Sequence, residues 1–440
     1  MANTYLTRTP SSTTNRKTFT ISTWFKRSAI SGSKQMILET AVDGSSYTNL
    51  IIRNTERLQF YSEHAGIAKI SITSQAQLRD VNGWYHAVVA VDTTQSTASN
   101  RVKLYINGEQ VTVFETETYC DQNFDTWVNY SSANNVLGRR SAYSDFYFDG
   151  SMSHFHLIDG TAYDASYFGS TDANGVWTIN TSPSVTYGNN GFFILKDGNS
   201  VTDQSGNSNN FTVAGGTLTK TEDNPSNVFA TLNPLLDVNA TPTFSNGNNT
   251  FVGTGSTNFA GSSIAVSSGK WYVEAKAATV NGSYPIIGVI DSQSTMRRDS
   301  TYFVGSDASA TNPSGFAVFS NGDIYHNGDN NFSNLTTTYT SGDIIGMALD
   351  MDASPNTLGF YKNGALEVTI NLDTAPSGAY MFASSVHASA SSGKVEINFG
   401  NGYFGTTAVS SAGTNASGNG IFEYDVPTGY TALSTKGLNL

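Results

Sequence analysis

The sequence contains one cysteine, few charged residues and no apolar run longer than a strand. Because Cys120 stands alone among the 440 residues, an intrachain disulfide and a cysteine-based metal cluster are excluded, and the lone thiol favours assembly in a reducing compartment. The longest apolar runs, such as residues 87–91, are far short of a membrane span, so no membrane insertion is expected. Residues 1–10 contain neither a basic nor an apolar stretch of the kind that begins a secretory signal, and none is expected.

Charge is scarce as well, and its balance is acidic. Only 13% of the residues are charged, and the formal net charge is −12. Nucleic-acid phosphates require a basic surface, and anionic membranes attract one, so this balance excludes the first kind of partner and disfavours the second. We therefore expect no nucleic-acid partner and a solvated acidic surface.

The chain is rich in Ser, Thr and Asn, and 12% of its residues are aromatic. Ser, Thr and Asn suit turns and strand edges and are poor in helix interiors. No long segment combines helical periodicity with a helix-forming composition, whereas residues 17–26 alternate apolar with polar as a half-buried strand does. The sequence therefore predicts an all-β fold.

A strand–turn–strand phrase occurs twice, at residues 102–113 and 358–369. Each copy turns at an Asn-Gly pair, Asn107-Gly108 and Asn363-Gly364, which readily takes the positive φ angles of a type I′ turn. Each is preceded by another predicted strand that ends in Asp. The repetition predicts two antiparallel β-sandwiches of the jelly-roll kind, in tandem.

The domain boundaries follow from the spacing of strands and turn residues. We expect the first sandwich at residues 1–163 and the second at residues 244–404. Residues 164–243 form a loop-rich connecting segment, whose strands we expect to add to the first sandwich. Residues 405–440 form a Gly- and Ser-rich C-terminal segment.

Two sets of motifs resemble known domain families. The first set comprises FTISTWF at residues 19–25, WYH at 84–86, LYING at 104–108 and FDG at 148–150. It resembles a laminin-G/concanavalin A-like domain. The second set comprises GKWYVE at residues 269–274, GDIIG at 342–346 and GFYKNG at 359–364. It resembles a SPRY domain.

The order of these two domains is similar to that in virion proteins of marine tailed bacteriophages, which are described as tail-fibre or structural proteins. The connecting motifs at residues 171–177 and 231–235 and the ending at residues 427–433 belong to the same pattern. The resemblance implies a protein displayed on the virion, assembled in the bacterial cytoplasm and released by lysis. It implies as partners other virion proteins, copies of the chain itself (a trimer by analogy with phage appendages) and a host-surface glycan or outer-membrane receptor.

Catalytic motifs are scarce. Retaining glycosidases need two carboxyl groups about 5 Å apart, and the nearest approach, Glu115 with Glu117, lacks a partner acid and follows a hairpin. His154 and His156 share one face of a predicted strand but lack a third metal ligand in view. No nucleophile elbow and no phosphate-binding loop is present. We therefore expect a protein that is not an enzyme, has no catalytic residue and requires no cofactor.

The laminin-G-like resemblance also implies a candidate calcium site. Laminin-G-like folds often hold Ca²⁺ at a rim of loops through Asp carboxylates and backbone carbonyls. The candidate ligands in or beside predicted loops are Asp43, Asp145, Asp149 and Asp203. Loop Asp residues also form ordinary Asx turns, so both readings stay open.

Two unusual stretches are candidates for ligand binding. The first mixes arginine with aromatic residues between two predicted strands, and its candidates are Arg139, Arg140, Tyr143, Phe146 and Tyr147. Aromatic faces stack on sugar rings, but the same composition suits a subunit interface or plain packing. The second stretch lies in loops where SPRY folds bind partners, and its candidates are Arg297, Arg298, Asp299, Tyr325 and His326.

These observations lead to one functional hypothesis with two rivals. We expect a non-enzymatic tail-fibre or adhesin protein of the virion that binds neighbouring subunits and a host-surface glycan or receptor. The first rival is a capsid-decoration or head-fibre protein without receptor binding. The second is a glycan-depolymerising enzyme of lectin-like fold, which the missing carboxylate pair disfavours.

Overall fold

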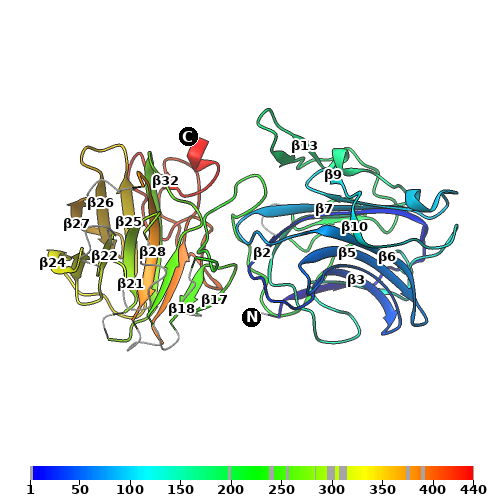
Figure 1. Ribbon diagram of the computed structural model, residues 1–440, viewed down its shortest axis with the longest axis horizontal. Helices are drawn as coiled ribbons and strands as arrows, with labels where there is room; N and C mark the ends of the chain where they lie inside the picture. The colour runs from blue at the N-terminus through cyan, green and yellow to red at the C-terminus, as the bar shows by residue number, and fades with distance from the viewer. Residues whose placement is uncertain are drawn as a thin grey trace. The chain divides into compact units, whose positions relative to one another are not determined.

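The chain folds into two compact units, Met1–Lys220 and Thr221–Leu440, each built mainly from antiparallel sheets (Figure 1). The computed structural model describes residues 3–196, 200–236, 242–253, 257–282, 284–294, 303–306, 315–372, 377–387 and 392–439. In these ranges there is no α-helix, and thus no helix long and apolar enough to cross a membrane. The predicted all-β fold is confirmed.

The first unit contains two large sheets. The eight-stranded sheet has the order β10 (Phe114–Thr118), β6 (Ile67–Gln77), β5 (Arg57–His64), β4 (Ser46–Ile52), β3 (Gln35–Asp43), β11 (Asn134–Leu137), β1 (Tyr5–Arg8) and β16 (Thr212–Gly215). The six-stranded sheet has the order β15 (Phe192–Ile194), β12 (Gly150–Asp159), β2 (Thr18–Arg27), β7 (Trp84–Asp92), β8 (Val102–Ile106) and β9 (Glu109–Gln110).

The core of the first unit lies between these sheets. Alternate residues of the larger sheet face inward, so that Leu38, Leu50 and Phe60 stand in register as partners on successive strands. They belong to one buried cluster with Ile21 and Leu104 of the smaller sheet. Each fully buried side chain of this size contributes roughly 1.5–3 kcal/mol relative to leaving it exposed, and this burial holds the sandwich together.

The second unit repeats the architecture. Its larger sheet has the order β17 (Thr243–Ser245), β18 (Thr250–Val252), β29 (Lys394–Asn398), β20 (Lys270–Thr279), β25 (Ile344–Asp350), β26 (Thr357–Lys362) and β27 (Ala365–Asn371), with β32 (Thr431–Ala432) paired in parallel to β20. Its smaller sheet has the order β19 (Asn258–Gly261), β28 (Tyr380–Val386), β21 (Ile286–Asp291), β22 (Phe316–Val318), β23 (Asp323–His326) and β24 (Asp329–Asn334). The two sheets enclose a buried cluster that includes Trp271 and Phe360 of the larger sheet and Phe382 of the smaller one.

Both predicted Asn-Gly hairpins are confirmed, and they have the same geometry. Asn107 and Asn363 each have φ of 48°, and Gly108 and Gly364 each have φ of 85°. The side-chain oxygen of each Asn accepts a backbone N–H from the strand beside the hairpin, from His86 of β7 at 2.8 Å in the first unit and from Ile344 of β25 at 2.9 Å in the second. The repeated phrase therefore fixes the same turn twice.

A later segment of the chain packs on each of these turns. In the first unit this segment is the short hairpin of β13 (Gly169–Thr171) and β14 (Trp177–Ile179), of which Figure 1 labels β13. Its Trp177 ring lies against Gly108. A Cβ atom at Gly108 would lie 2.4 Å from that ring, and one at Gly364 would lie 2.6 Å from the ring of Tyr424. Glycine is therefore required at both turns by the positive φ and by the covering aromatic side chain.

The boundary between the two compact units lies within the loop-rich segment at residues 164–243. Strands of this segment pair within the first sandwich, because β15 pairs with β12 and β16 pairs with β1. The division, however, falls at Lys220–Thr221, and residues that follow it pair within the second unit, as Phe229 does with Ser434. The expected Gly- and Ser-rich tail is likewise part of the second unit, because β32 joins its larger sheet. The sequence did not predict this pairing, because both segments are rich in turn residues and the paired residues are about 200 positions apart.

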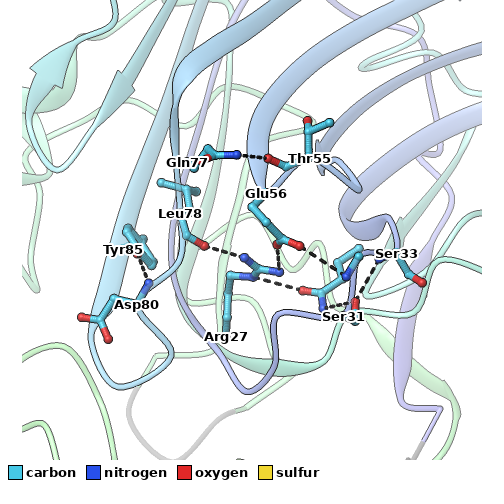
Figure 2. Close-up of polar contacts among 11 residues, drawn as sticks. Arg27, Ser31, Ser33, Thr55, Glu56, Gln77, Leu78, Asp80 and Tyr85 are labelled. Atoms are coloured by element: carbon cyan, nitrogen blue, oxygen red, sulfur yellow. Dashed lines mark hydrogen bonds and ion pairs between the residues drawn. The ribbon is translucent and has the colours of Figure 1, made fainter. Parts of the chain in front are cut away.

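One end of the first unit is built around a buried ion pair (Figure 2). Arg27 has no exposed surface, and its Nη2 lies 2.5 Å from Oε2 of Glu56. Its Nη1 donates to the carbonyl oxygen of Leu78 at 2.5 Å, while Oε1 of Glu56 accepts the backbone N–H of Gly32 at 3.3 Å. A buried guanidinium needs such partners, and these contacts tie three separate loops together.

Candidate ligand-binding face of the first unit

The eight-stranded sheet has a second face, opposite the core, and this face is polar. Because side chains alternate along a strand, the neighbours of the core residues point outward. Cross-strand pairing joins Glu39 to Asn49 and Asn49 to Tyr61. We call this surface the outer face and define it by Glu39, Tyr47, Asn49, Gln59, Tyr61 and Thr73.

Two tyrosines form the aromatic part of the outer face. The rings of Tyr47 and Tyr61 lie 5.8 Å apart, and both side chains are partly exposed. Both hydroxyls donate to Oε2 of Glu63, at 3.3 Å and 2.7 Å. Burial and the neighbouring carboxylate raise both phenol pKa values, that of Tyr47 to about 12, so both rings stay neutral at physiological pH. The pair presents apolar ring surface beside fixed polar groups.

Amide groups form the polar part of the outer face. The Gln59 amide donates to the hydroxyls of Ser71 and Thr73 at 3.1 Å and 2.9 Å. Asn49 is only 6% exposed, and its Oδ1 has no hydrogen-bond partner within the described part of the chain. The amide group of Asn49 is therefore enclosed below the exposed rings of the outer face.

The predicted loop with Arg139 and Tyr147 lies along the edge of the outer face, against β3. The carbonyl oxygen of Phe146 accepts the N–H of Met36 at 2.8 Å. The N–H of Ser141 donates to Oε2 of Glu39 at 2.5 Å. At its tip Tyr143 is 53% exposed and reaches toward the turn after β3, where its hydroxyl oxygen lies 2.8 Å from an ideal Cβ position on Gly44. The loop therefore borders the outer face along β3.

The two arginines of this loop pack on aromatic rings. The Arg140 guanidinium lies 4.1 Å from the ring centre of Tyr143 and 5.3 Å from that of Phe146, and its Nη1 is 3.7 Å from Oδ2 of Asp145. Arg139 lies 3.9 Å from the ring centre of Tyr5 on β1. The structure thus brings together the first set of predicted binding residues, of which Tyr143 offers the most exposed ring.

The second set of predicted binding residues is not confirmed as loop residues. Arg297, Arg298 and Asp299 lie outside the described residues. Tyr325 and His326 belong to strand β23, so their placement in a loop was wrong. His326 is buried and stacks on Phe316 with ring centres 3.9 Å apart, because the strand carries it onto the sheet. Little of its surface is available to a ligand.

The four candidate calcium ligands do not gather at one place. Asp203 is almost completely buried, and its two carboxylate oxygens accept backbone N–H groups from Phe193, Ser205 and Asn209 at 2.8–2.9 Å. Asp43 accepts from Ser45 in an Asx turn, and Asp145 faces Arg140. Burial raises the pKa of Asp149. Within the described ranges no three His, Cys, Asp or Glu residues are placed to hold a metal ion.

The remaining candidates for chemistry have structural partners. His154 and His156 are buried, and the Nδ1 atom of each lies within 2.9 Å of a hydroxyl group, on Ser153 and Tyr187 respectively. Glu115 pairs with Arg57 at 3.3 Å at the edge of the sheet, and Glu117 accepts from Tyr119. Burial raises the pKa of Cys120 to about 11, which keeps the thiol protonated and unreactive.

Sequence reasoning missed the outer face itself. Glu39, Asn49 and Tyr61 lie 22 positions apart at most, on three short strands that the sequence analysis did not pair. Their signal was present, since each is the polar neighbour of an apolar core residue in an alternating strand. The strand register that aligns these three side chains includes a bulge in β3, and the sequence contains no pattern that predicts this bulge.

One family model matches the chain, and the match lies in the first unit. Residues 1–166 match the laminin-G family model of the concanavalin A-like lectin/glucanases superfamily. The expected laminin-G/concanavalin A-like resemblance of this part of the chain is thus confirmed. No curated protein matches the sequence.

Several solved structures are similar to parts of the chain. The SPRY domain of human HERC1 is 20% identical over 38% of this chain and 96% of its own, with a TM-score of 0.31. A heptameric SAP-like pentraxin from Limulus polyphemus is 14% identical over 36% of this chain and 71% of its own, with a TM-score of 0.28. The carbohydrate-binding module CBM40 of the Ruminococcus gnavus IT-sialidase, bound to α2,3-sialyllactose, is 20% identical over 31% of this chain and 75% of its own, with a TM-score of 0.25. A second SPRY domain, also human, is 19% identical over 34% of this chain and 90% of its own, with a TM-score of 0.26.

Proposed function

We propose that this chain is a non-enzymatic protein of a bacteriophage particle, and that the outer face of its first unit binds a glycan on the host surface. The observation that carries the glycan-binding part is the partly exposed Tyr47–Tyr61 pair, whose hydroxyls donate to Glu63, beside the loop that carries the exposed ring of Tyr143. Sugar rings present apolar faces and many hydroxyls, which fit aromatic rings beside amide and carboxylate acceptors. The lectin-superfamily match of residues 1–166 supports this reading.

The virion part of the proposal rests on the order of the sequence motifs. A laminin-G-like phrase followed by a SPRY-like phrase, with the same connecting motifs, is similar to phage tail-fibre and structural proteins. In that setting the chain is part of a symmetric homo-oligomer, a trimer by analogy, contacts other virion proteins, and is released by lysis. Weak surface charge and exposed aromatic residues suit such protein contacts.

Glycan binding is tested with the purified chain on intact host cells and on polysaccharide extracted from them. We expect saturable binding by the natural chain and a loss of about tenfold in affinity for Tyr143→Ala, as for a tyrosine at the centre of an interface. Tyr167→Ala is the matched control, because Tyr167 is also an exposed tyrosine (41%) but lies in the η2 turn (Ala165–Tyr167) on the other sheet's side. Equal losses in both variants, or no binding by the natural chain, would refute the glycan site.

Further measurements distinguish the proposed adhesin from a decoration protein and from an enzyme, and test for calcium. Imaging of labelled chains on the particle distinguishes tail-tip placement from a capsid position, and a capsid position without cell binding would establish a decoration protein instead. Repeating the binding measurement with a calcium chelator tests the calcium hypothesis, because a bridging ion would make binding chelator-sensitive. Release of reducing sugar from the polysaccharide would instead point to the depolymerising enzyme.

A further inference from the structure

The loop that carries Tyr143 is hydrogen-bonded to the sheet through one strand, β3. Backbone hydrogen bonds fix its two ends, from Gly138 to the carbonyl oxygen of Ile37 at 3.2 Å and from Met36 to that of Phe146 at 2.8 Å. Between these ends, the Arg139 guanidinium packs on the Tyr5 ring of β1, and the backbone of residues 139–145 is hydrogen-bonded to the sheet through one side chain. That side chain is Glu39, which accepts the N–H of Ser141 at 2.5 Å.

Glu39 is a carboxylate in an unusual position. It is only 2% exposed, although it stands on the face of the sheet away from the core. The groups that face it are Arg140 and Asp145 from the loop and Tyr47 and Asn49 from β4. Burial raises the pKa of Glu39, while the Ser141 N–H, Arg140 and Asn49 lower it in part. An acidic side chain is therefore retained at a costly site, where it meets both the loop and the outer face.

We propose that Glu39 is the positioning residue of the ligand-binding loop: it holds Ser141, and through it Arg140 and Tyr143, in place beside the outer face. The inference rests on the proposed glycan binding for its functional consequence, but the attachment of the loop does not depend on a ligand. Glu39 contacts the loop and not the exposed ring, so its effect on binding is indirect. Loss of its acceptor oxygen leaves the part-buried Ser141 N–H without this hydrogen bond, and the lost bond favours the detached loop.

The first measurement is hydrogen exchange of the backbone amides of residues 139–147, which needs no ligand. We expect Glu39→Ala to speed exchange across this segment by about tenfold, and Glu39→Gln, which keeps an acceptor oxygen, to restore most of the protection. Glu109→Ala is the matched control, since Glu109 is an exposed glutamate on the short edge strand β9 of the other sheet. Exchange in β7 and β12 serves as the check that each variant is folded.

The second measurement is affinity for the extracted host polysaccharide. We expect Glu39→Ala to weaken binding about tenfold and Glu39→Gln to bind within about threefold of the natural chain. Unchanged exchange of residues 139–147 in Glu39→Ala would overturn the inference, and so would equal weakening by Glu39→Ala and Glu39→Gln. If the natural chain binds no polysaccharide, the proposed function fails, while the exchange result still decides the role of Glu39.

Discussion

Acid should destabilise the first unit, because two buried histidines are neutral in the folded state. His86 has no exposed surface and lies between two tryptophans, with ring centres 4.7 Å from Trp24 and 6.0 Å from Trp177. Its Nδ1 lies 3.0 Å from Nε1 of Trp177, which can only donate, so Nδ1 carries no proton. Burial lowers the pKa of His86 to about 3, and burial together with neighbouring positive charge holds the pKa of His156 well below its usual range.

The magnitude follows from the proton balance between the folded and unfolded states. A histidine whose folded pKa is lowered contributes stability that is fully present above the unfolded value, near 6.5, and is lost as the pH falls below it. A pH of 5.0 is about 1.5 units below the unfolded pKa, and each unit is worth about 1.36 kcal/mol, so each such histidine lowers the free energy of unfolding by about 2 kcal/mol. His86 and His156 together therefore remove about 4 kcal/mol, a large part of the 5–15 kcal/mol by which native domains are usually stable.

The assay is urea unfolding between pH 7.0 and pH 5.0, followed by tryptophan fluorescence, since Trp24 and Trp177 flank His86. We expect His86→Gln to be less stable at pH 7.0 but to lose about 1.4 kcal/mol less per pH unit below pH 6 than the natural chain. His64→Gln is the control, because His64 is exposed. An unchanged pH slope in His86→Gln would refute the reasoning, since it would mean that the buried imidazole accepts a proton without cost.

Three other outcomes are expected. Burial raises the pKa of Glu274 to about 7, although two backbone N–H groups donate to its carboxylate, so its contribution to stability is present below pH 4.5 and is lost as the pH rises through 7. Between pH 5.5 and pH 8.5 the natural chain should therefore lose about 2 kcal/mol in urea unfolding that Glu274→Gln keeps, and an identical pH profile of the two chains would contradict this. Arg27→Met should cost about 3–5 kcal/mol in the same assay, because it leaves Glu56 charged and buried, and the double variant with Glu56→Leu should recover most of the loss; no recovery would exclude the ion-pair explanation. Gly108→Ala should destabilise the first unit by more than 1 kcal/mol and displace the Trp177 ring, which near-ultraviolet circular dichroism would detect; an unaltered spectrum and midpoint would show that the turn tolerates a side chain.

The sequence by itself determined the local features of this fold. The scarcity of helix-forming segments, the alternation in residues 17–26 and the two Asn-Gly turns each depend on neighbouring residues only. The turns are at Asn107 and Asn363 as predicted, because few residues besides Asn and Gly take their positive φ angles without strain. The arginine- and tyrosine-rich stretch was also recognised as one surface, because its members are contiguous in the chain.

Only the tertiary structure decided which distant residues meet. The outer face depends on the register of three strands, and a shift by one residue would turn Glu39 and Asn49 into the core. The position of the unit boundary depends on pairing between residues such as Phe229 and Ser434, whose separation leaves no local trace. His326 shows the same limit, since a stretch that reads as a polar loop is a strand whose histidine stacks on Phe316. Local conformational preferences are written in neighbouring residues, whereas burial and cross-strand partners are properties of the packed sheets.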